Sequence, residues 1–64
     1  MSITLFQKEN GNLHGEVYIE KDSKLYFVRI TQDRFTVYKN YFISQENAKR
    51  ALQCALKRLS ENEN

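Results

Sequence analysis

The chain of 64 residues has one cysteine, two glycines, no proline and no long apolar stretch. Cys54 alone cannot form a disulfide within the chain, and one cysteine with one histidine cannot supply the four ligands of a structural zinc site. Two glycines leave no glycine-rich phosphate loop. No stretch approaches the roughly 20 apolar residues that a membrane-spanning helix needs. We therefore expect no metal, no cofactor and no membrane partner.

The length and the termini of the sequence suggest one small domain. A chain this short buries only about 60% of its unfolded surface, so regular local structure or self-association must add stability. Residues 1–10 lack the basic segment and apolar run of a signal peptide, and a lone cysteine is typical of a reducing compartment. We expect a cytoplasmic domain over residues 1–60 and a polar tail at 61–64, with SENEN (60–64) as the candidate for disorder.

Charge is distributed unevenly along the chain. Residues 1–23 carry two lysines and four acids, whereas residues 24–60 carry eight basic side chains and two acids. A basic C-terminal half suits an anionic partner, and ordinary surface solubility explains it equally well.

Three turn signals divide the first forty residues. Asn10-Gly11 is a strong hairpin signal, because a type I′ turn needs positive φ at both central residues. KDSK (21–24) and TQDR (31–34) also fit two-residue turns. The runs between these signals are rich in Val, Ile, Tyr, Phe and Thr. They predict strands at about 2–9, 12–20, 24–31 and 34–40.

The predicted turns fix the pairing of the last three strands. If Asp22-Ser23 and Gln32-Asp33 are the central residues of their turns, opposing residues share one face of the sheet. The predicted core face then has the rows Val17–Val28–Val37 and Gly15–Ile30–Phe35, with Ile19 beside Tyr26.

The opposite, outer face combines aromatic and charged side chains. A turn at Asn10-Gly11 would set Phe6 opposite Gly15 on the core face, and would leave Ile3 and Leu5 on the outer face. Cross-strand aromatic and ionic pairs each stabilise a sheet by about 0.2–1 kcal/mol. The predicted outer rows are Tyr18–Phe27–Tyr38 and Glu16–Arg29–Thr36.

The segment FISQENAKRALQCALKRL (42–59) predicts one amphipathic helix. Ser44 stands at the N-cap and Glu46 in the first turn, where the helix dipole favours an acid. The apolar stripe should pack on the face that holds Val17, Val28 and Val37. We therefore predict an α+β fold, an antiparallel β-meander of three to four strands with this C-terminal helix on one face. The stripe consists of Ala48, Ala51, Leu52, Ala55, Leu56 and Leu59.

Candidate catalytic groups are isolated in the sequence. His14 has no evident acid or nucleophile beside it, which is typical of an exposed loop histidine. Cys54 lies beside the apolar stripe without a base, which favours a half-buried packing cysteine. Glu16 and Glu20 share a face, but Arg29 opposes Glu16, so a surface ion pair is favoured. We expect neither an enzyme nor a small-molecule substrate.

The outer sheet face is the candidate binding surface. One helix covers only one face of a sheet, so the aromatic row on the other face lies open, and an open apolar patch often marks an interaction site. Cross-strand aromatics that merely stabilise the sheet are the structural alternative. The candidate residues are Tyr18, Phe27, Arg29, Arg34, Thr36, Tyr38 and Lys39, and the helix adds the auxiliary basic residues Lys49, Arg50, Lys57 and Arg58, which a solvated face also explains.

Residues 15–55 resemble the AP2-like and integrase amino-terminal DNA-binding domains, in which a three-stranded antiparallel sheet packs on one C-terminal helix. The resemblance rests on GEVYI, YFVRI, FTV and YFISQENAKRA. Asn40 replaces the usual glycine two residues before Phe42, two glutamates accompany Arg29, and the strand at 2–9 is additional. The resemblance implies that Phe42, Ala48 and Ala51 are core, and that the major groove contacts are Tyr18, Phe27, Arg29, Thr36 and Tyr38.

Two binding functions follow from the sequence. Aromatics beside arginine can contact DNA through a sheet, so nucleic-acid binding is the leading prediction. The alternative is a protein-interaction module, such as a small inhibitor, an adaptor or a homodimer. Glu16 and Glu20 on the same face count against phosphate contact and favour this alternative.

Overall fold

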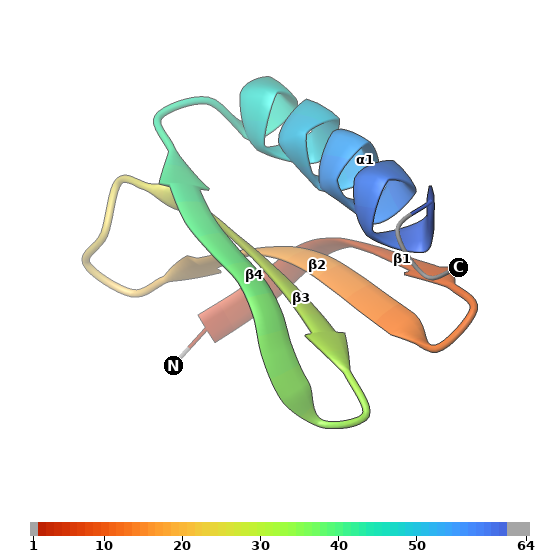
Figure 1. The fold of residues 1–64 in the computed structure, drawn as a ribbon. Coiled ribbons are helices and arrows are strands. Elements are labelled where there is room, and N and C mark those ends of the chain that lie inside the picture. The colour runs from red at the N-terminus through yellow and green to blue at the C-terminus, as the bar shows by residue number, and fades with distance from the viewer. Residues whose placement is uncertain (1, 62–64) are drawn as a thin grey trace.

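The computed structural model describes residues 2–61, which form one antiparallel sheet and one helix (Figure 1). The strands follow each other in the sheet in chain order, β1-β2-β3-β4. This arrangement confirms the predicted α+β meander. The elements are β1 (Ser2–Asn10), β2 (Leu13–Glu20), β3 (Tyr26–Gln32), β4 (Phe35–Phe42) and α1 (Gln45–Glu61).

The helix α1 begins where the sequence predicts. The Ser44 hydroxyl accepts a hydrogen bond from the Asn47 N–H at 3.4 Å, which satisfies one of the free amides of the first turn. The helix continues through Ser60 to Glu61, so the first two residues of the segment expected to be disordered are helical. Residues 62–64 lie outside the described part of the chain. None of the described helical residues belongs to a helix long and apolar enough to cross a membrane.

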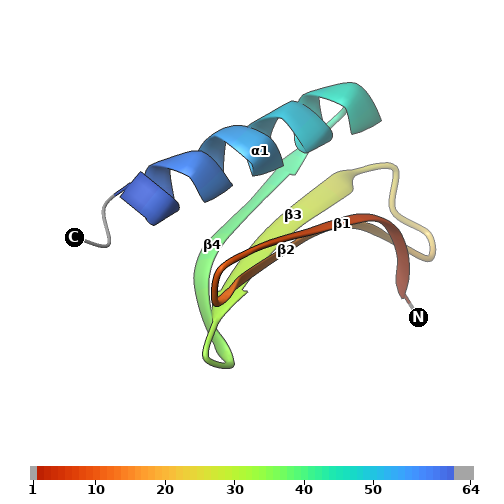
Figure 2. The same ribbon diagram turned by 90° about the vertical axis from the view of Figure 1, so that its right-hand side faces the viewer.

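The core lies between α1 and one face of the sheet, and the other face has no helix over it (Figure 2). The helix lies close against the sheet at Gly15, where an added Cβ would lie 2.5 Å from Leu52 Cδ1. The buried residues confirm that the helix stripe packs on the face that holds Val17 and Val28. They are Leu13, Val17, Val28, Ile30, Ala48, Leu52 and Leu56.

The pairing of β2 with β3 is as predicted. Val17 lies opposite Val28, Tyr18 opposite Phe27, and Glu16 opposite Arg29. A shift of either strand by one residue would turn its valine to solvent and its member of the ion pair toward the core, so alternation excludes that register, and the turn between the strands excludes larger shifts.

The predicted pairing of β3 with β4 is wrong. The turn is centred on Asp33 and Arg34, whose φ angles of 51° and 74° fit a type I′ turn. The register then shifts once, because Thr31 pairs with Thr36 but Ile30 pairs with Tyr38, which leaves Val37 unpaired. Such a β-bulge exchanges the two faces of the strand beyond it.

The bulge decides which β4 side chains face the helix. Tyr38, Asn40 and Phe42 lie on the helix face, and Lys39 and Tyr41 lie on the outer face. Without the extra residue, Lys39 would face the helix, where an unpaired charge is costly to bury. The predicted positions of Val37 in the core and Tyr38 in the outer row are therefore both corrected.

The first hairpin also differs from its prediction. Its central residues are Gly11 and Asn12, and positive φ occurs only at Gly11 (64°), as in a type II′ turn. A second bulge leaves Leu5 unpaired. Phe6 lies on the helix face as expected, but opposite Val17, and Ile3 lies opposite Ile19 on that face and not on the outer one.

Candidate functional site

The aromatic row on the outer face runs across β2, β3 and β4 as Tyr18–Phe27–Tyr41. The Tyr18 and Phe27 rings stack with centroids 5.4 Å apart, and the Phe27 and Tyr41 centroids are 6.5 Å apart. Tyr41 therefore takes the place predicted for Tyr38. The sequence contains both tyrosines, and only the bulge in β4 decides between them.

Tyr18 is almost fully buried, although it lies on the sheet face that has no helix over it. Its residue surface is 6% exposed. Phe27 covers one part of it, and the Arg29 guanidinium lies 5.2 Å from its ring centre, as in a cation–π contact. Tyr18 thus stabilises the sheet, and Phe27 and Tyr41 remain as the accessible aromatics of the row.

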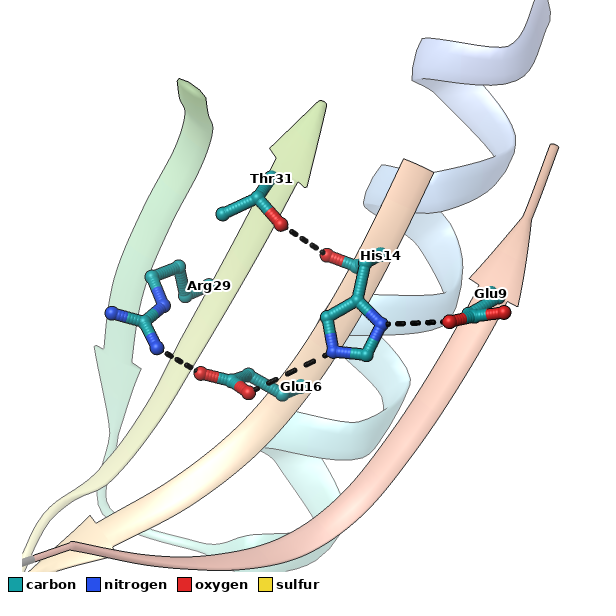
Figure 3. A network of polar contacts seen from close by, with 5 residues as sticks. All are labelled: Glu9, His14, Glu16, Arg29 and Thr31. Atoms are coloured by element: carbon teal, nitrogen blue, oxygen red, sulfur yellow. Dashed lines mark hydrogen bonds and ion pairs between the residues drawn. The ribbon is translucent and has the colours of Figure 1, made fainter. Parts of the chain in front are cut away.

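A polar network occupies the rest of the outer face (Figure 3). The Arg29 guanidinium donates to the Glu16 carboxylate, which confirms the predicted ion pair. His14 lies between two acids, with Nδ1 at 3.2 Å from Glu9 Oε1 and Nε2 at 3.9 Å from Glu16 Oε2. The Thr31 hydroxyl donates to the His14 carbonyl at 3.4 Å. The prediction of a loop histidine without an acid partner is therefore wrong.

The predicted basic residues of the sheet lie around this network and not in one cluster. Lys39 lies opposite Arg29 on the outer face, and Thr36 lies opposite Thr31. Arg34 lies in the turn that leads into β4. Because Glu16 pairs with Arg29, the cations of this region without an ion pair among residues 2–61 are Lys39 and Arg34, both exposed.

The four auxiliary basic residues belong to α1, on the other layer of the molecule. Lys49 Nζ lies 5.2 Å from the Phe6 ring centre, which ties it to β1. Lys57 lines a hollow beside Lys8 and Asn10, and Arg58 lines a groove beside β4. Arg50 is exposed. The predicted cations thus lie on several sides of the protein, which is not the single basic face that a phosphate backbone would contact.

The structure reveals a surface along β4 that the sequence prediction missed. Phe35, Val37 and Tyr41 on this strand are 74%, 41% and 60% exposed, and Ile43, which follows it, is 85% exposed. β4 is an edge strand, so its outer side has no strand partner in the sheet. The absence of proline and the apolar residues of this strand were a visible signal, but the expected pairing placed Phe35 and Val37 in the core. The exposure of both side chains corrects these two predictions.

A groove of about 390 Å³ separates β4 from the C-terminal half of α1. Its lining combines apolar side chains with one cation: Tyr38, Ala51, Cys54, Ala55, Arg58 and Leu59. Ala51, Ala55 and Leu59 were predicted as core, and the structure leaves them half-buried. Cys54 is exposed in this groove, so its predicted role as a half-buried packing residue is corrected.

Within the described residues 2–61, no group of three or more His, Cys, Asp or Glu side chains is placed to hold a metal ion. The chemical groups of the surface along β4 are aromatic rings, aliphatic side chains and a few cations.

Comparison with family models, with curated proteins and with solved structures found no match to the chain. The likeness to AP2-like and integrase amino-terminal domains is thus neither supported nor contradicted.

Proposed function

We propose that the protein is a non-enzymatic protein-interaction module whose docking element is β4. One observation carries the proposal. Six large hydrophobic side chains of the described residues are exposed, and four of them lie on β4 or directly after it. An exposed apolar patch on an edge strand is a template for another chain, and proteins usually protect such an edge.

The charge distribution favours a protein over a nucleic acid as the partner. The outer face holds Glu9, Glu16 and Glu20, and Arg29 is already paired with one of these acids. A nucleic-acid surface needs several free cations on one side, because phosphate contacts supply most of its affinity. Exposed Phe35 and Ile43 contribute nothing to such contacts and much to a protein interface.

Nucleic-acid binding remains the second candidate, on one specific observation. The outer-face positions of β3 and β4 contain aromatics, threonines and the cations Arg29 and Lys39 but no acid, and Arg34 extends this side at the turn. A DNA duplex that contacted only β3 and β4 would lie away from most of the outer-face glutamates, which are on β1 and β2.

The two candidates are separated by their response to salt and to substitution. Affinity capture with Phe35→Ser/Val37→Thr as bait should lose the partners that the wild type retains at high salt. Arg50→Ser, an exposed change on α1, is the control and should retain them. Fluorescence anisotropy with a mixed-sequence DNA duplex tests the other candidate: binding that falls steeply with salt and weakens on Arg34→Ala would establish it and overturn ours.

A further inference from the structure

The open edge of β4 lies beside the groove between β4 and α1. Together these two features indicate the kind of segment that could bind here. The groove borders the helix face of β4, where Tyr38 lies, and the outer face of the strand presents Lys39 and Tyr41. In an extended chain, successive side chains point to opposite faces of the sheet. A strand added to β4 would therefore place every second side chain beside the groove and the others beside Lys39.

We propose that β4 binds an extended segment of another protein by strand addition, and that this segment alternates apolar with acidic residues. This inference rests on the proposed function and names the partner's chemistry. Main-chain hydrogen bonds hold a chain in this binding mode, and pockets for alternate side chains select its sequence. Most of the groove surface is apolar, and Ala51, Ala55 and Leu59 contribute to it, so the groove selects aliphatic side chains.

Lys39, on the outer face of β4, selects acids for the other positions. It is the one charged residue within the β4 sequence, and Asp33 and Arg34 occupy the turn before the strand. An acid directly across from Lys39 forms a favourable cross-strand pair, and a cation there is repelled.

The same charges disfavour a second copy of the chain as the occupant. Antiparallel pairing of β4 with its own copy would be symmetric about a twofold axis. Lys39 lies at the middle of the strand, so both copies of Lys39 would approach this axis. The two grooves, each with Arg58, would lie on one face of the joined sheet. Like charges would therefore meet on both faces.

The Asn40 side chain occupies a backbone amide at the open edge of β4. Its Oδ1 accepts a hydrogen bond from the exposed Tyr41 N–H at 2.8 Å, and its Nδ2 donates to the Tyr38 hydroxyl at 3.4 Å. A strand amide that takes a side-chain acceptor from its own neighbour faces the open edge of the sheet. The carbonyl of an added strand replaces this acceptor. Asn40→Ala removes the competing acceptor and should tighten binding.

The probe is a synthetic peptide as long as β4 (8 residues), with valine and glutamate in alternation and acetyl and amide ends. In NMR titrations of the labelled protein, we expect the peptide to shift the amides of Lys39, Tyr41, Ala55 and Leu59 saturably. Two matched peptides serve as controls: one has lysine in place of glutamate, and one has a central proline, which cannot donate to the strand ladder. Both should bind at least about tenfold more weakly, roughly the loss of 1.4 kcal/mol.

Charge reversal on β4 and on the helix gives the matched pair of variants. Lys39→Glu changes the cation beside the acids of the added strand, whereas Lys57→Glu makes the same change of charge on the side of α1 away from the groove. We expect Lys39→Glu to weaken the glutamate peptide about fivefold, the size of one exposed charge pair, and Lys57→Glu to change it little. Cys54 adds an independent readout, because the bound peptide should slow its modification by a thiol reagent.

Several results would overturn strand addition. Equal binding of the proline peptide, or shifts confined to Phe27 and the outer face, would remove it. Equal binding of the lysine peptide would remove the acidic specificity. Concentration-dependent shifts without peptide would make the occupant a second copy. If the peptides fail while the β4 variants still lose captured partners, strand addition is wrong and the proposed function stands. If the peptides do not bind and the β4 variants retain the captured partners, both strand addition and the proposed function are wrong.

Discussion

The contact between Gly15 and the helix sets the height at which α1 lies above the sheet. Gly15→Ala would place a Cβ 2.5 Å from Leu52 Cδ1 and 3.3 Å from Leu56 Cδ1. Apolar carbons pack at about 3.5–4.0 Å, so the fully buried Leu52 must move by about 1 Å. Overpacking of this kind costs about 1–3 kcal/mol, and the lower backbone entropy of the unfolded alanine chain offsets about 0.5–1 kcal/mol. With the middle of each range, a net loss of about 1 kcal/mol remains.

Thermal unfolding followed by circular dichroism measures this loss. For a domain of this size, about 1 kcal/mol corresponds to about 4–8 °C, so the unfolding temperature of Gly15→Ala should fall by about this amount. Leu52→Val shortens the obstructing side chain at a cost of about 1 kcal/mol. In Gly15→Ala/Leu52→Val the two losses should add to less than their sum, because the clash is gone. Full additivity, or a Gly15→Ala protein as stable as the wild type, would show that the helix does not lie against Gly15.

Three further outcomes are expected from the helix. Ser44→Ala removes the acceptor of the Asn47 N–H and should lower the free energy of unfolding in urea by about 1 kcal/mol, whereas no change would show an uncapped start. Leu56→Ala, in the core, should cost about 2–5 kcal/mol in the same assay and more than Leu59→Ala, which is only half-buried. Cys54 should react with a thiol reagent in the native protein almost as fast as in urea, and strong protection would place it in the core.

The parts of the fold with one physical solution could be predicted from the sequence. The α1 stripe and its cap depend on local spacing, and the turn predicted at Asp22-Ser23 together with alternation sets Val17 opposite Val28 on the core face. The pair Glu16–Arg29 then follows from the same alternation. Local patterns and burial agreed at these positions, so no further information was needed.

The β4 strand could not be placed by alternation alone. Two turn positions within TQDR are one residue apart, and a bulge at Val37 then changes the face of every later residue. One signal was present in the sequence. The predicted register placed Lys39 opposite Tyr26 on the core face, where burial of the lysine charge would be costly. Giving weight to this lysine would have favoured a bulge and moved Tyr41 into the aromatic row.

The groove depends on the angle between the helix and the strands, which the periodicity of the helix sequence does not give. The stripe of α1 predicts which helix residues face the sheet, but the angle between helix and strands decides how far each strand is covered. The helix buries Ala48, Leu52 and Leu56 over the central strands and leaves Ala55 and Leu59 half-covered beside β4. The exposure of Cys54 follows from this angle, which results from packing across the whole interface.

The two edges of the sheet differ, and this difference limits what the protein can assemble. β1 exposes Ile3 and Leu5 and is interrupted by a bulge at Leu5, whereas β4 and the residue after it expose four large hydrophobic side chains. A filament grows only if each added copy presents a new edge that accepts the next one. A partner that occupies β4 leaves only the edge β1 free, and the bulge blunts this edge. Association through this sheet therefore ends after one step, as a finite complex.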